Sequence, residues 1–131
     1  MTLQRPIDFA LGCPYAVRLF SHVMVAAIIV LAGCSRAPVV TITNHSTHAL
    51  ANVVVSGSGF SNRIDSIAAR ATSSLTVRPR GESAVRVTFV ADGRSIDSGE
   101  QGYFEAGGGY RVAIAVEPDL KVTVSADLRG Y

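Results

Sequence analysis

Two histidines, His45 and His48, lie three residues apart in the part of the chain that follows its apolar N-terminal segment. Imidazole nitrogens bind zinc and copper, so these two histidines are candidate metal ligands. Zinc normally takes at least three protein ligands, however, and no cysteine or acidic residue lies near either histidine in the sequence. We therefore expect no metal and no other cofactor, and we expect both histidines to be exposed at a turn.

Hydrolytic chemistry would need a nucleophile held by a base, and the base in turn held by a carboxylate. The chain contains neither a Gly-x-Ser-x-Gly elbow nor a Ser-x-x-Lys pair. The segment Gly57-Ser-Gly-Phe-Ser-Asn62 lacks the third glycine of a dinucleotide-binding loop, and Gly107 to Gly109 lack the Lys-Ser or Lys-Thr of a phosphate loop. We therefore expect a protein that is not an enzyme.

Aromatic residues gather around the glycine-rich stretch between Gly99 and Gly109. Tyrosine and phenylalanine beside a loop can form a surface that binds a partner. The alternative is that they pack in the core and at its rim. The candidate interaction surface consists of Tyr103, Phe104, Tyr110 and Arg111, with Arg94 as a further polar neighbour.

These residues must be positioned by strands, because apolar and polar residues alternate with a period of two from Val39 onward. Asp92-Gly93 predicts a tight hairpin turn between two of the strands, and Glu117-Pro118-Asp119 predicts another turn. A looser segment is expected around Phe60, Ile64 and Ile67. The expected strands cover residues 39–43, 50–55, 74–77, 84–90, 94–98, 110–116 and 120–124.

No segment after residue 38 shows sustained helical spacing, so the sequence predicts an all-β fold, an antiparallel sandwich of about seven or eight strands over residues 39–131. The stretch from Val39 to Val77 resembles bacterial immunoglobulin-like adhesion and accessory modules. It contains Val-Thr-Ile-Thr-Asn-His-Ser, then Leu-Ala-Asn-Val-Val-Val, then Ile-Asp-Ser-Ile-Ala, with Ala69-Arg70-Ala71 where those modules usually have Pro-Gly. This resemblance implies a fold and no ligand. The tryptophan and paired cysteines of antibody domains are absent.

The N-terminal part has the composition of an export signal. Val23 to Ala32 is an uncharged apolar run of about ten residues, which is too short to cross a hydrocarbon core that needs about 20. Arg5 and Arg18 precede the run and small residues end it. The stretch before it is long for such a leader and contains Asp8, which leaves open a true start downstream of Met1. We expect a helical signal peptide over residues 1–33.

The residues Leu31-Ala32-Gly33-Cys34 match the lipobox of bacterial lipoproteins. This resemblance implies that a diacylglycerol alkylates the Cys34 thiol, that the leader is then cleaved between Gly33 and Cys34, and that palmitate is among the attached acyl chains. It also implies a lipidated tether over residues 34–38. The alternative is an ordinary secretory signal that happens to contain a cysteine. In Gram-negative lipoproteins an aspartate after the cysteine favours the inner membrane, so Ser35 implies the periplasmic face of the outer membrane.

Charge gives little further guidance. With Arg5, Arg18 and Asp8 set aside, the twelve Lys and Arg residues become ten and the ten Asp and Glu residues become nine. No run of like charges occurs, so we expect no nucleic-acid partner. The sequence predicts a non-enzymatic envelope lipoprotein that acts as a structural or protein-interaction module with an envelope protein partner. The alternative is a small ligand-binding or hydrolase-inhibitor lipoprotein that recognises glycan or an enzyme.

Overall fold

A computed structural model of the chain describes residues 36–128. The predicted signal peptide, its cleavage site and Cys34 lie outside the described residues. Within them, no helix is long and apolar enough to span a membrane.

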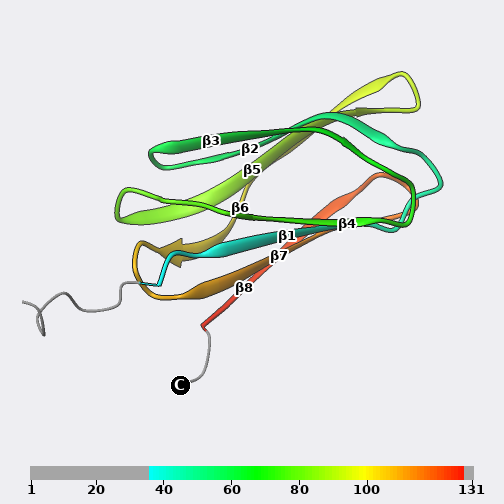
Figure 1. Cartoon of the computed structure of the whole chain (residues 1–131). Coiled ribbons are helices and arrows are strands. Elements are labelled where there is room, and N and C mark those ends of the chain that lie inside the picture. The colour runs from blue at the N-terminus through cyan, green and yellow to red at the C-terminus, as the bar shows by residue number, and fades with distance from the viewer. Residues whose placement is uncertain (1–35, 129–131) are drawn as a thin grey trace, which may run out of the picture. The chain divides into compact units, whose positions relative to one another are not determined.

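Eight strands form two four-stranded sheets (Figure 1). One sheet has the order β4-β1-β7-β8 and the other has the order β3-β2-β5-β6. The predicted all-β sandwich of seven or eight strands is therefore confirmed. The strands are β1 (Val39–Asn44), β2 (Leu50–Gly57), β3 (Phe60–Ile67), β4 (Thr72–Thr76), β5 (Glu82–Ala91), β6 (Arg94–Glu105), β7 (Tyr110–Val116) and β8 (Val122–Leu128).

One strand pair departs from the antiparallel arrangement. β1 runs parallel to β7, in register from Val39 opposite Arg111 to Asn44 opposite Val116. All the other strand pairs are antiparallel. The parallel pair is possible because β1 and β7 are far apart in the sequence, so no tight hairpin fixes their relative direction. The expected antiparallel sandwich is thus correct for the sheets as a whole but not for this pair.

The core lies between the two sheets and follows the alternation of the sequence. In β5 every second residue from Val85 to Phe89 is buried, while Arg86 between them is exposed. The same alternation buries Val40 and Ile42 of β1. Full burial of an aliphatic or aromatic side chain contributes about 1.5–3 kcal/mol, so this stripe of side chains holds the sheets together. The largest core side chains are Phe89, Phe104, Ile42, Leu50 and Ile114.

Two segments that the sequence predicted as loose belong to strands. β3 covers the segment around Ile64, and it was missed because only Ile67 in it is fully buried, so the strand lacks an alternating apolar pattern.

β6 continues through Gly99 and Gly102, where the sequence suggested loops. Both glycines have positive φ angles, 66° and 72°, and the register to β5 shifts twice along this strand. These irregularities are β-bulges, which glycine tolerates at little steric cost.

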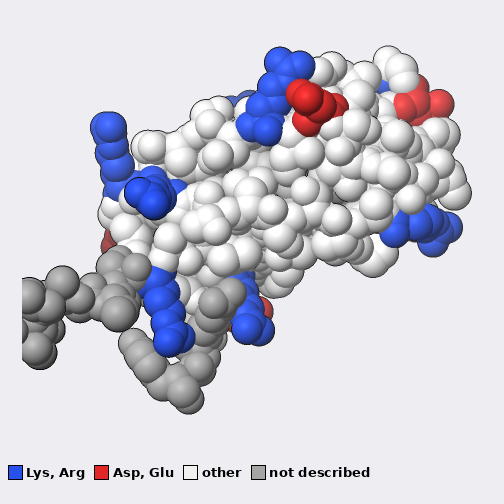
Figure 2. Space-filling model, in the orientation of Figure 1, with Lys and Arg blue, Asp and Glu red and all other residues white. Residues whose placement is uncertain are grey.

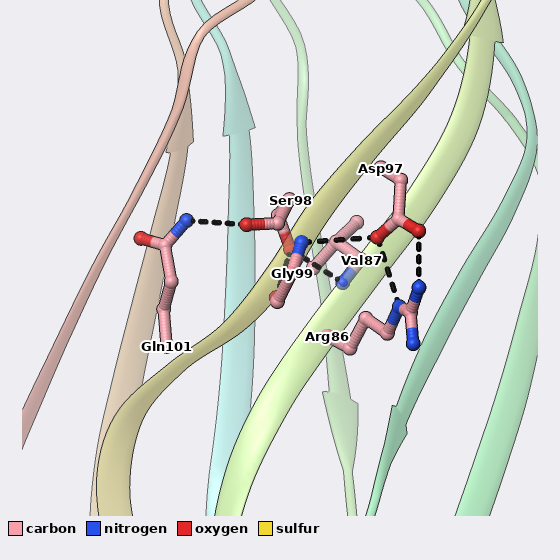
Figure 3. A network of polar contacts seen from close by, with 6 residues as sticks. All are labelled: Arg86, Val87, Asp97, Ser98, Gly99 and Gln101. Carbon is pink, nitrogen blue, oxygen red and sulfur yellow. Dashed lines mark hydrogen bonds and ion pairs between the residues drawn. The ribbon is translucent and has the colours of Figure 1, made fainter.

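A polar network at the first bulge of β6 connects this strand to β5 in its own sheet and to β8 in the other sheet. Figure 3 shows the part of the network around Ser98. The Ser98 hydroxyl accepts a hydrogen bond from the Val87 amide at 2.9 Å, which replaces a ladder bond that the bulge removes. The Gln101 amide group donates to the Ser98 carbonyl at 2.9 Å and, more weakly, to the Val122 carbonyl of β8 at 3.4 Å. The network therefore links the two sheets along the β6–β8 side of the sandwich.

The turns gather at the two ends of the sandwich (Figure 1). We define the proximal end as residues 36–38, 58–59, 77–81 and 106–109, and the distal end as residues 45–49, 68–71, 92–93 and 117–121. At the distal end, Asp92 and Gly93 have φ angles of 50° and 68°, which confirms the predicted hairpin turn.

Candidate functional site

The distal end is organised by one buried amide. Asn44 and Ser46 are fully buried although both are polar. The Asn44 side-chain NH₂ donates to the His48 carbonyl at 2.8 Å and to the Ala68 carbonyl at 3.0 Å. Its oxygen accepts from the Ser46 amide at 3.0 Å and from the Ser46 hydroxyl at 2.7 Å. Asn44 therefore fastens the loop after β1 to the turn between β3 and β4.

The two histidines beside this network are exposed, and hydrogen bonds hold the backbone that carries them. His45 is exposed, and its backbone amide donates to the Val116 carbonyl at 2.8 Å. The His48 side chain is also well exposed, and its Nδ1 lies 3.9 Å from the Asp92 carboxylate of the β5–β6 turn. Sequence reasoning missed Asp92 as a neighbour of His48 because the residues are far apart in the chain. Within residues 36–128, no three histidine, cysteine or acidic side chains lie close enough together to hold a metal ion.

At the proximal end, the segment before β1 is held against the domain. The Arg36 carbonyl accepts a hydrogen bond from the Gly109 amide at 3.0 Å, and the Pro38 carbonyl accepts one from Val77 at 3.0 Å. Arg36 also forms an isolated parallel bridge with Gly108. The described part of the expected tether, residues 36–38, is thus docked against the domain.

The proximal end is hollowed beside that segment. An open hollow of about 410 Å³ is lined by Ala37, Pro38, Val77, Arg78, Pro79, Ala106 and Gly107. Its walls are small or apolar side chains, and its charged side chain is that of Arg78. Arg80 follows Arg78 by two residues in the chain and is exposed. Its backbone amide donates to the Ser58 carbonyl at 2.8 Å.

The residues predicted to form one aromatic surface do not lie together in the structure. Tyr103, on β6, is 49% exposed, and its hydroxyl donates to the Glu105 carboxylate. That hydrogen bond is the main reason why the pKa of Tyr103 is raised well above its ordinary value. Tyr110 is half-buried on β7, in the other sheet, and Arg111 beside it is exposed. These three residues lie toward the proximal end, whereas Arg94 follows the distal β5–β6 turn.

Phe104 is a core residue, which corrects its place in the predicted surface. It is 0% exposed, and its ring centroid lies 6.2 Å from that of the half-buried Phe60. Neighbouring residues of a strand point to opposite faces, so Tyr103 and Phe104 cannot share one surface once β6 extends through them. The prediction that Phe104 lies on the surface was wrong because the flanking glycines indicated a loop at this point of the chain.

A second, more polar hollow of about 430 Å³ lies over β2 and β5. Arg86 at its edge pairs with Asp97, with a guanidinium nitrogen 2.9 Å from the carboxylate (Figure 3). This hydrogen bond, with a second from the Gly99 amide, lowers the pKa of Asp97 to about 2. The hollow is lined by Ser56, Gly57, Ser58, Glu82, Ser83, Ala84, Arg86 and Glu100.

The fold and these surfaces define a small β-sandwich domain with two loop ends of different character. No protein-family model matches the chain, and no curated protein matches it. A solved NMR structure of a protein from Eubacterium rectale is similar, with 13% sequence identity and a TM-score of 0.45. The match covers 73% of this chain and 91% of that one.

Proposed function

We propose that the chain is a lipid-anchored protein of the bacterial cell envelope, without enzymatic activity, whose β-sandwich presents its distal end to an envelope protein. The lipid anchor is Cys34, after cleavage at Gly33. Because the residue after Cys34 is serine and not aspartate, the proposed location is the periplasmic face of the outer membrane.

The observation that carries this proposal is the separation of the two ends. Arg36 enters the domain at the proximal end and follows Cys34 by two residues, so a lipid on Cys34 would tether the sandwich by the end opposite the distal loops. β5 alone has ten residues, and strands rise about 3.3 Å per residue, so the distal end stands roughly 30 Å from the anchor. A surface at that distance is accessible to another envelope protein.

The distal end is also suited to recognition because its loops are preorganised. The buried side chains of Asn44 and Ser46 hold the backbone of the distal loops in place through hydrogen bonds, so binding a partner would cost little conformational entropy. The side chains displayed there carry both signs of charge, including Asp92, Arg94 and Lys121. This arrangement favours the distal end over the aromatic group that the sequence indicated, since Tyr103 and Tyr110 lie nearer the anchor.

Site-directed cross-linking in cells tests this proposal. Cys13 and Cys34 are the two cysteines of the chain, so a lipidated, processed protein has no free thiol and an introduced cysteine is unique. We expect His45→Cys at the distal end to give a discrete cross-linked product with a thiol-reactive reagent. Ser125→Cys, exposed on β8, is the matched control and should give none. Identical products from both positions, or none from His45→Cys, would contradict a distal partner site.

The second candidate is a glycan-binding or hydrolase-inhibiting lipoprotein, and the polar hollow over β2 and β5 favours it. Serine hydroxyls, the Arg86 guanidinium and the Glu82 and Glu100 carboxylates are groups that form hydrogen bonds to sugars. Retention of the protein on purified cell-wall polysaccharide, lost in Arg86→Gln, would support this function. Retention that is unchanged in Arg86→Gln, or absent in the unaltered protein, would remove this role for the hollow.

A further inference from the structure

The proximal end carries three exposed arginines on segments that the backbone holds together. Arg36 is fixed to Gly109, while Arg78 and Arg80 flank the buried Pro79. None of the ion pairs within residues 36–128 includes any of these three arginines. Figure 2 shows blue side chains gathered at the end of the sandwich that bears the β2–β3 and β4–β5 turns.

The carboxylates near this end lie on other strands. Glu82 and Glu105 are paired in register on β5 and β6, where both interact with the Tyr103 hydroxyl. Asp127 on β8 lies opposite Arg111. The acidic groups are therefore on the β5–β6 side and on β8, whereas Arg78 lines the hollow and Arg36 directly precedes Ala37, which also lines it.

Geometry requires this surface to lie close to whatever holds Cys34. An extended chain spans at most about 3.6 Å per residue, so the Cα atoms of Arg36 and Cys34 are within about 7 Å of each other. Arg36 is itself fixed to the domain, so one residue of sequence separates Cys34 from the docked segment. A lipid on Cys34 would therefore bring the arginines and the hollow into the headgroup layer.

The chemistry of this end matches anionic phospholipid headgroups. Guanidinium groups bind phosphate through paired, charge-assisted hydrogen bonds. The walls of the hollow, from Pro38, Val77, Pro79 and Ala106, are apolar enough to lie in the interfacial region at small desolvation cost.

We propose that the proximal end is a membrane-contact surface, in which Arg36, Arg78 and Arg80 bind the phosphates of anionic phospholipids and hold the sandwich upright on the bilayer. This inference rests on the proposed anchor at Cys34 and adds an orientation to it. Each basic side chain near an anionic membrane shifts the docking equilibrium roughly fivefold, so the three together shift it about 100-fold. The domain then stands with its distal end pointing away from the lipid.

The test uses the domain from Cys34 onward, coupled chemically through that thiol to maleimide lipids in vesicles. The described residues form one compact unit with a continuous core of their own, so this part folds independently. The chain has no tryptophan, so Ala106→Trp at the proximal end or Ala69→Trp at the distal end is a unique fluorescent donor. Dansyl-labelled headgroups are the acceptor.

In phosphatidylglycerol vesicles we expect strong energy transfer from Ala106→Trp and weak transfer from Ala69→Trp. The coupled thiol keeps Ala106→Trp near the lipid in every vesicle, so the orientation is measured from Ala69→Trp. Replacing Arg36, Arg78 and Arg80 with glutamine should let the domain tilt and raise the transfer from Ala69→Trp to its value in phosphatidylcholine vesicles, and high salt should do the same. A matched control, Arg70→Gln with Arg94→Gln at the distal end, should leave it unchanged.

Equal transfer from Ala69→Trp in both vesicle types, or transfer from this position that is unchanged by the triple replacement, would overturn the membrane-contact surface. Because the coupling is chemical, that failure would leave the cellular lipidation of Cys34 unaffected. A failure of lipidation in cells would instead be detected by mass measurement of the N-terminus, independently of the vesicle experiment.

Discussion

Replacing Asn44 with alanine tests whether the distal end depends on one buried side chain. The replacement removes a donor to the His48 and Ala68 carbonyls and an acceptor for the Ser46 amide and hydroxyl. The Ser46 hydroxyl still lies 3.0 Å from the His48 carbonyl and can donate to it. The Ala68 carbonyl keeps a hydrogen bond of 3.2 Å from the Ala71 amide. The Ser46 amide is therefore the group that loses its partner without a substitute.

A buried polar group left without its hydrogen bond costs about 1–3 kcal/mol. One such group gives an expected loss of about 1–3 kcal/mol in the free energy of unfolding, a substantial fraction of the 5–15 kcal/mol typical of a domain. For a domain of this size, each kcal/mol lowers the thermal midpoint by about 4–8 °C. The expected decrease is therefore on the order of 4–24 °C.

Chemical denaturation of the domain, followed by circular dichroism, measures this loss. Thr43→Ala is the matched control on the same strand, because the Thr43 hydroxyl makes an exposed bond of 3.3 Å to Thr72 and its removal should cost less than about 0.5 kcal/mol. Amide exchange should also increase first in the loops after β1 and β3. A loss below about 1 kcal/mol for Asn44→Ala would refute the view that this network organises the distal end.

Three further outcomes follow from the packing and the charges. Phe104→Ala should lower the free energy of unfolding by about 3–5 kcal/mol and Tyr103→Ala by less than about 1 kcal/mol, and similar losses in urea denaturation would contradict the opposite orientations of these side chains. Asp97→Asn should destabilise the domain at neutral pH but hardly at pH 2, because the lowered pKa stabilises the fold above about pH 3.8 and that contribution is lost as the pH falls toward 2; a difference that is independent of pH would refute this. Gly93→Ala should cost about 1 kcal/mol in the same denaturation assay, because its φ of 68° suits glycine, and no loss would contradict the turn geometry.

The sequence predicted the fold where hydrophobic alternation was strong. Val85, Val87 and Phe89 alternate with polar residues on the most regular strand, and the structure buries all three. β3 was not predicted because an edge strand buries one side chain where a central strand buries several. The parallel pairing of β1 with β7 could not be predicted either, since it depends on contacts between segments far apart in the chain.

The candidate site was harder to predict than the fold. Asn44 and Ser46 looked like ordinary turn residues, and their burial becomes evident only when the β3–β4 turn is placed over them. The proximal arginines are scattered along the chain at positions 36, 78 and 80, so no run of positive charge indicated a common surface. For both sites the missing information was which loops share an end of the sandwich.

Mass spectrometry of the protein purified from a Gram-negative host tests the central claim most directly. We predict that the mature N-terminal residue is Cys34 and that it carries a thioether-linked diacylglycerol, and that Cys34→Ser abolishes both the modification and the membrane association. A mature chain that begins at another residue, or an unmodified Cys34 thiol in the membrane fraction, would contradict the lipid anchor.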